Sequence, residues 1–292
     1  MNLISARTQT VLTDMQINEL TESHIYRSIA KGMKAGENRE LLLRIADDEE
    51  RHAGIWQNYT GKQVKPKRGK IVWFTLLARI FGFTFAIKLM EKGEGKASET
   101  YGSISLEVPE ASKIAQEEDV HEEKLIAMLD EERLQYVGSM VLGLSDALVE
   151  LSGTLAGLTF ALQNTRIIAL SGLITGISAT LSMASSEYLS SRSEGNQNAL
   201  KSGLYTGVVY LMTVALLVLP YLILPVDGYM GALAIMLGTV VLIILGFTYY
   251  ISVAKDLPFF KRFFEMAGIS LAVAALSFVI GIAVKHFLGI EI

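Results

Sequence analysis

Two pairs of residues in the first half of the sequence have the types and spacing of metal ligands. Each pair has a glutamate three residues before a histidine: Glu49 with His52, and Glu118 with His121. Residues three apart lie on one face of a helix, so each pair can present a carboxylate and an imidazole together. Two of the four histidines of the chain lie in these pairs, which chance placement makes unlikely. The spacing predicts two metal-binding helices.

Two single glutamates extend this pattern. Glu19 and Glu94 each stand seven residues before a tyrosine, Tyr26 and Tyr101. Two Glu helices alternating with two Glu-x-x-His helices form the ligand set of a di-iron or di-manganese site in a four-helix bundle. Mixed carboxylate and imidazole ligands suit divalent iron or manganese. A charged helical bundle without a metal is the alternative.

A second set of acids lies in the apolar half of the chain. Val137–Leu162 is long enough to cross a bilayer, yet it carries Asp146 and Glu150 four residues apart. A carboxylate at mid-membrane costs about 2.5–3.5 kcal/mol, so it is rarely kept unless it pairs, faces a cavity or handles an ion. Met183 and Glu187 repeat the spacing in the next apolar segment. A thioether is a soft ligand that favours iron over calcium or magnesium. The alternatives are that Met183 only packs against neighbouring helices and that Glu187 lies at the membrane interface.

The charge distribution separates these two sets of acids. The chain of 292 residues is 51% hydrophobic with a mean hydropathy of +0.38, which indicates an integral membrane protein with a polar part. Of its 56 charged residues, 41 precede Val137. This predicts a polar domain over residues 1–135 and a membrane domain over residues 136–292. The net charge of −4 offers no basic surface for nucleic acid, and the absence of cysteine excludes disulfides and thiolate sites.

The polar domain is expected to be helical. Apolar spacing predicts helices over residues 13–33 and 37–59, and a further helix from Pro109 to about Leu134. Residues 71–90 are nearly long enough to span a membrane but carry Arg79 in their middle, after the basic connector KQVKPKRGK. We interpret them as a helix lying on the membrane surface. A true span is the alternative, but it would place the two halves of the predicted ligand set on opposite sides of the bilayer.

The membrane domain is expected to be all-α with five spans. The apolar segments cover residues 137–162, 167–189, 203–224, 230–253 and 266–287. Basic residues gather after the second and fourth spans, at Arg192, Lys201, Lys255, Lys261 and Arg262. By the positive-inside rule these loops are cytoplasmic, which puts the N-terminal domain inside the cell and the C-terminus outside. The first residues lack the apolar core of a signal peptide, in agreement with this topology.

Residues 14–134 resemble the ferritin-like, rubrerythrin-type family through the two Glu-x-x-His pairs and the two single glutamates. The resemblance implies a four-helix bundle that holds two iron ions, or manganese. The implied ligands are Glu19, Glu49, His52, Glu94, Glu118 and His121, with Glu91 as an additional or exchanging ligand. The neighbouring Glu117, Glu122 and Glu123 are interpreted as a solvated acidic face.

Residues 136–288 resemble the vacuolar iron transporter family through the motifs GLSDAL and MASSEY in the first two spans. The resemblance implies a homodimer in the cell membrane that moves Fe²⁺ or Mn²⁺ out of the cytosol in exchange for protons. Asp146 and Met183 would line the pathway, and Glu150 and Glu187 would be adjoining ligands or proton carriers. The link over residues 190–202 is shorter than the Glu-rich insertion that many members carry there. The whole chain resembles the membrane-bound ferritin type of fusion.

The expected function is therefore iron export, with a cytoplasmic di-metal bundle that captures or senses the metal. A membrane-anchored ferroxidase or peroxidase of rubrerythrin type is the alternative, and no residue is assigned as catalytic. In a third interpretation the metal content of the bundle gates the pore.

Overall fold

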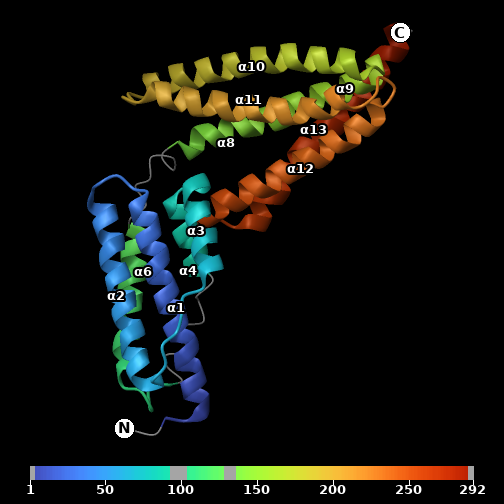
Figure 1. Ribbon diagram of the computed structural model, residues 1–292. Helices are drawn as coiled ribbons and strands as arrows, with labels where there is room; N and C mark the ends of the chain where they lie inside the picture. The colour runs from blue at the N-terminus through green and yellow to red at the C-terminus, as the bar shows by residue number, and fades with distance from the viewer. Residues whose placement is uncertain (1–3, 93–103, 128–135, 289–292) are drawn as a thin grey trace. The chain divides into compact units, whose positions relative to one another are not determined.

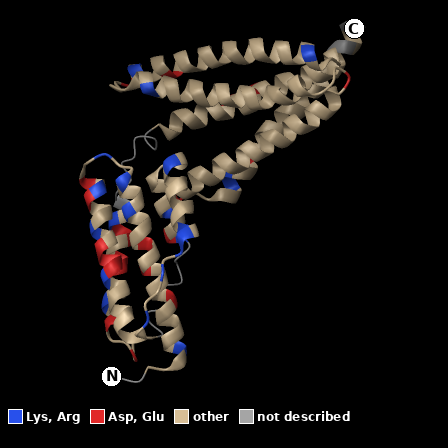
Figure 2. Cartoon of the chain, in the orientation of Figure 1, with Lys and Arg blue, Asp and Glu red and all other residues tan. Residues whose placement is uncertain are grey.

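The computed structural model describes residues 4–92, 104–127 and 136–288, and every regular element among them is a helix (Figure 1). The chain divides into two compact units, Met1–Leu134 and Gln135–Ile292. Charged side chains are concentrated on the helices of the first unit and are sparse along those of the second (Figure 2). The two units therefore differ in composition, the first being rich in charged residues and the second predominantly apolar.

The first unit contains five described helices. They are α1 (Ala6–Lys31), α2 (Glu37–Thr60), α3 (Arg68–Phe81), α4 (Phe83–Lys92) and α6 (Glu110–Ala127). An apolar cluster that includes Leu12, Trp56 and Ile114 holds α1, α2 and α6 together. Helix α1 begins seven residues before the predicted start at residue 13, because Ser5 caps it by accepting a hydrogen bond from the Thr8 amide at 3.2 Å.

The single helix expected over residues 71–90 is two helices in the structure. Gly82 separates α3 from α4 and has φ 98°, a backbone conformation that glycine adopts readily. Helix α3 has 14 residues, which at 1.5 Å per residue gives about 21 Å, well short of the roughly 30 Å hydrocarbon core. Helix α4 buries Phe85, Ile87 and Met90. Only α3 therefore remains a candidate for a helix at the membrane surface.

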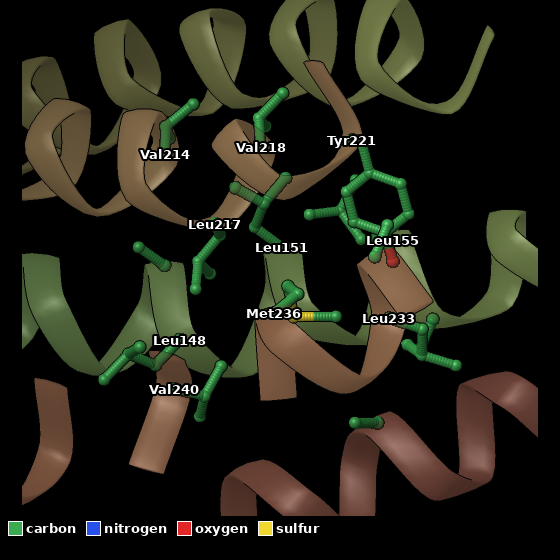
Figure 3. Packing of buried hydrophobic residues seen from close by; sticks show 14 of the residues in the cluster. Leu148, Leu151, Leu155, Val214, Leu217, Val218, Tyr221, Leu233, Met236 and Val240 are labelled. Atoms are coloured by element: carbon green, nitrogen blue, oxygen red, sulfur yellow. The ribbon is translucent and has the colours of Figure 1, made fainter. Parts of the chain in front are cut away.

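The second unit contains five helices that are long and apolar enough to cross a membrane, as predicted. The first is built from α8 (Val137–Asp146), the π-helical turn η1 (Ala147–Leu151) and α9 (Ser152–Leu162). The others are α10 (Thr165–Ser193), α11 (Ala199–Ile223), α12 (Tyr229–Ala254) and α13 (Phe259–Leu288). Leucines of the first span pack against α11 and α12 in the main apolar cluster (Figure 3). The first span is thus the central helix of the unit.

Candidate functional site

Four residues of the first unit bring potential ligand atoms together. Glu19 on α1, Glu49 and His52 on α2, and Glu118 on α6 each offer one atom, and these atoms lie within 4.8 Å of one another. Glu19, Glu49 and His52 are buried, and Glu118 is partly buried. The structure therefore gathers four of the predicted ligands from three helices around one centre.

Glu49 and Glu118 each reach both histidines. The Nδ1 atom of His52 lies 3.4 Å from Glu49 Oε2 and 2.8 Å from Glu118 Oε1. The Nδ1 atom of His121 lies 3.2 Å from Glu49 Oε1 and 3.8 Å from Glu118 Oε2. Each carboxylate thus directs one oxygen to each imidazole, and the two rings are stacked with centroids 5.9 Å apart. Carboxylates shared in this way are suited to bridge two cations.

Several buried atoms of this cluster have no hydrogen bond within the described part of the protein. They are Glu49 Oε2, His52 Nδ1, Glu118 Oε1 and His121 Nδ1. They face one another as ion pairs, the shortest being His52 Nδ1 to Glu118 Oε1 at 2.8 Å, and so converge on one buried centre. All four are atoms that bind metals, and carboxylate oxygen with imidazole nitrogen suits divalent iron or manganese. The donor set fits a metal centre.

The acids and histidines also neutralise one another when no metal is bound. Burial acts to lower the pKa of His52, but its contacts with Glu118, Glu19 and Glu49 outweigh this and raise the pKa to about 12. Burial likewise acts to lower the pKa of His121, but its contacts with Glu118 and Glu49 outweigh this and raise the pKa to about 10. Burial raises the pKa of Glu49, whereas the two histidines hold the pKa of Glu118 at about 2 despite its burial. Two imidazolium ions therefore occupy the metal-free cluster near neutral pH.

The outer nitrogen of each histidine contacts an acid of the opposite helix. His52 Nε2 lies 2.8 Å from Glu117 Oε2, and His121 Nε2 lies 3.2 Å from Asp48 Oδ2. Arg51 Nη2 joins these acids at 2.7 Å from Glu117 and 3.0 Å from Asp48. Carboxylates in this position fix the ring orientation and tautomer of a metal-binding histidine. They leave Nδ1 directed towards the centre.

Sequence reasoning missed this outer layer. The interpretation of Glu117 as part of a solvated face is wrong, because its side chain is only 28% exposed and contacts His52. Glu122 and Glu123 are exposed, as expected. The available signal was that both Glu-x-x-His pairs are preceded directly by another acid, Asp48 or Glu117.

Two aromatic side chains hold further predicted ligands. Tyr26 donates a hydrogen bond to Glu91 Oε1 at 2.8 Å, and the buried Trp56 donates one from Nε1 to Glu19 Oε1 at 3.1 Å. Burial, together with the charge of Glu118, raises the pKa of Glu91, so Glu91 lies within electrostatic range of the cluster. The predicted ligand Glu94 and its partner Tyr101 lie outside the described residues.

The second unit holds Asp146 and Glu150 beside a tyrosine of α11. A side chain at Gly143 would lie 2.6 Å from the Thr206 carbonyl oxygen, so this glycine allows α8 and α11 to approach closely. One turn further along α11, Tyr210 donates a hydrogen bond to Glu150 Oε2 at 3.3 Å and also interacts with Asp146. The π-helical turn begins directly after Asp146 and contains Glu150. Such turns are frequent at functional sites.

Met183 and Glu187 lie in other surroundings. Met183 packs against the main apolar cluster of the unit, and Glu187 accepts a hydrogen bond from Ser139 Oγ at 2.7 Å. Ser139 precedes Asp146 by two helical turns, about 10 Å along the helix axis. Glu187 therefore lies beside the beginning of α8, whereas Asp146 lies at its end.

The comparison with known families concerns this second unit. The model of the VIT family matches residues 137–197, which include Asp146, Glu150, Met183 and Glu187. No curated protein matches the chain. Together with the five apolar helices, the family match supports a VIT-type membrane domain, and hence a metal-ion transporter, in the second half of the chain.

Proposed function

We propose that the protein exports divalent iron, or manganese, from the cytosol through its second unit, and that the first unit captures the metal. The observation that carries the transport proposal is the VIT family match over the first two spans, the first of which contains Asp146 and Glu150. In this proposal the first unit is cytoplasmic, the C-terminus lies outside the cell membrane, and two copies of the chain form a homodimer.

The first unit is proposed to be a ferritin-like bundle with a di-iron or di-manganese site. Glu49 and Glu118, which each reach both histidines, would bind both ions. His52 and His121 would each bind one ion through Nδ1, with Glu19 and Glu91 as further ligands. Glu94 would complete the set. Bound iron would supply redox reactivity towards oxygen or peroxide, while the protein keeps the ligands buried and oriented.

In the second unit, Asp146 and Glu150 are proposed to bind the transported ion and to exchange it for protons. Tyr210 supports this assignment because its neutral hydroxyl donates a hydrogen bond to Glu150 and also interacts with Asp146. An ion that passes through must bind weakly enough to leave. Met183 and Glu187 would contact the ion at other points of the pathway.

Vesicles that contain the purified protein and a metal-sensitive dye test the transport proposal. We expect Fe²⁺ or Mn²⁺ flux that increases with a pH gradient and is lost in Asp146→Ala. The matched control is Asp227→Ala, because Asp227 is an exposed acid between the third and fourth spans. Flux that is unchanged in Asp146→Ala would contradict the proposal.

The second candidate function is a membrane-anchored ferroxidase or peroxidase. It is favoured by the oxidisable side chains of Trp56 and Tyr26, which bond directly to predicted ligands. This candidate requires that Asp146→Ala retains full activity and that His52→Ala abolishes iron oxidation in the same vesicles. If bundle variants instead shift the metal concentration that gives half-maximal flux, the bundle regulates the pore.

A further inference from the structure

Helix α3 carries an apolar stripe on its outer face. The stripe consists of four side chains that are 47–67% exposed: Val72, Trp73, Leu76 and Ile80. At 3.6 residues per turn these positions lie on one side of the helix. Phe74 and Leu77, on the other side, are buried within the first unit. Helix α3 therefore packs with one face and exposes a second apolar face.

Basic residues precede and flank this stripe along the chain, because Lys62 and Lys65 lie on the connector before α3 and Arg68 and Arg79 lie on α3 itself. Lys62, Lys65, Arg68 and Arg79 are exposed, and we call these four the basic border. Two other cations of the same stretch are engaged within the unit, since Lys67 Nζ lies 3.0 Å from Asn18 Oδ1 and Lys70 Nζ lies 3.3 Å from Glu22 Oε1. The basic border thus faces solvent while its neighbours anchor the segment.

Hydrogen bonds fix the orientation of the stripe. Gln16 Nε2 donates to the Lys62 carbonyl oxygen at 3.0 Å, and the Lys67 amide donates to Thr21 Oγ1 at 3.0 Å. Further along, Thr75 Oγ1 donates to Ser28 Oγ at 2.9 Å. These contacts tie both the connector and α3 to α1. The stripe cannot rotate into the core of the unit without breaking them.

We propose that the apolar stripe and the basic border bind the anionic surface of the bilayer that the five spans cross. A helix with an apolar face and a cationic margin inserts the former among acyl chains and places the latter at negatively charged headgroups. Helix α3 is too short to span, so it lies along the surface. Charge complementarity selects anionic lipid as the occupant, and the same chain carries five candidate spans for such a bilayer.

Tryptophan fluorescence provides a specific test, because the chain contains only Trp56 and Trp73. Trp56 is fully buried in the first unit, whereas Trp73 belongs to the stripe. The full chain is reconstituted into vesicles of phosphatidylcholine and phosphatidylglycerol in which one lipid carries bromine near the headgroup end of its acyl chains. We expect bromine to quench the Trp73 emission and the Trp73→Phe variant to lose this quenching. If wild type and Trp73→Phe are quenched equally, the proposal is overturned.

The contribution of the basic border is tested by changing lipid and protein separately. We expect weaker Trp73 quenching in phosphatidylcholine alone, and the same weakening in a variant with Lys62, Lys65 and Arg68 changed to glutamine. The control variant, Arg7→Gln with Lys124→Gln, removes exposed charges elsewhere on the unit and should behave as wild type. Quenching that is the same at every lipid charge and in the variant would show that the basic border does not bind headgroups, and an absence of quenching would show that protein covers the stripe; either result would overturn the proposal.

A polar substitution in the stripe gives a second measurement. Leu76→Gln should reduce bromine quenching of Trp73 and increase its quenching by acrylamide from the water phase. Leu106→Gln is the matched control, because Leu106 is 97% exposed and lies outside α3. Strong acrylamide quenching in wild type, equal to that in Leu76→Gln, would mean that the stripe already lies in water, which contradicts the proposal.

Discussion

The two units surround their acids differently, because Glu49 is buried among charged partners whereas Glu150 is exposed and Asp146 is partly buried. In the first unit, Glu49 and Glu118 face two imidazoles whose raised pKa values keep them charged, and outer acids and Arg51 surround these rings. In the second unit, Asp146 and Glu150 share the neutral hydroxyl of Tyr210. A fully compensated cluster stays folded without a metal and can hold one firmly. Asp146 and Glu150 instead contact each other and a neutral hydroxyl, an arrangement that suits an ion that passes through.

The largest expected effect is on stability, after loss of a compensating cation in the first unit. In the metal-free protein, His52→Ala should destabilise this unit by about 3–5 kcal/mol, because several buried carboxylates lose their partner. Hydrogen exchange of α2 in the full chain, treated with a chelator, measures the loss. His24→Ala is the control, since His24 is exposed on α1. Equal effects of the two substitutions would show that the cluster is not compensated by His52.

The second prediction concerns pH. The pKa values of about 12 for His52 and about 10 for His121 mean that metal binding must displace both protons near neutral pH. Affinity should therefore rise by up to about 100-fold per pH unit between pH 7 and pH 9. Calorimetric titration with Mn²⁺ in buffers of different ionisation enthalpy counts the released protons.

Stability of the metal-free protein should change in the opposite direction. A raised histidine pKa gives stabilisation that is complete below the ordinary value of 6.5 and is lost as pH rises through 10 to 12. Hydrogen exchange of α2 in the chelator-treated protein should thus accelerate at strongly alkaline pH. Equal Mn²⁺ affinity at pH 6.5 and pH 8, with no proton release, would contradict the imidazolium assignment.

Much of the difference between the polar first unit and the apolar second unit could be predicted from local sequence. The five spans follow from hydropathy and length, since about 20 apolar residues suffice to cross a bilayer. The gathering of Glu19, Glu49, His52 and Glu118 follows from ligand types at helical spacing, because a repeated Glu-x-x-His pair is rare on a solvated helix face.

The features that the sequence did not predict depend on contacts between distant residues or on backbone detail. Glu117 resembles any acid on a polar helix until α6 is packed against α2. The division at Gly82 was missed because a single glycine is tolerated within many helices. The π-helical turn after Asp146 has no sequence signal in hydropathy or spacing, since an apolar helix of the same length looks identical.

The third prediction concerns the outer layer of the first unit. Glu117→Gln removes the charge next to His52 Nε2 while keeping the shape, and should weaken metal affinity by about 10- to 100-fold. Glu123→Gln, on the exposed face of the same helix, is the control and should have no effect. Competition with a chromogenic chelator measures both variants. If Glu117→Gln binds like Glu123→Gln, the contact with Glu117 does not orient His52.

The smallest expected change is again in stability, now in the second unit. Asp146→Asn keeps the side-chain shape and removes one of the two acidic groups that contact each other and the Tyr210 hydroxyl. The asparagine amide is itself polar and retains part of the desolvation cost, so the resistance of the second unit to unfolding in mixed micelles should be unchanged or slightly greater. The same variant should lose flux, which separates function from folding. A destabilisation as large as that expected for His52→Ala would mean that Asp146 has a compensating structural partner, and the contrast between the two units would then be wrong.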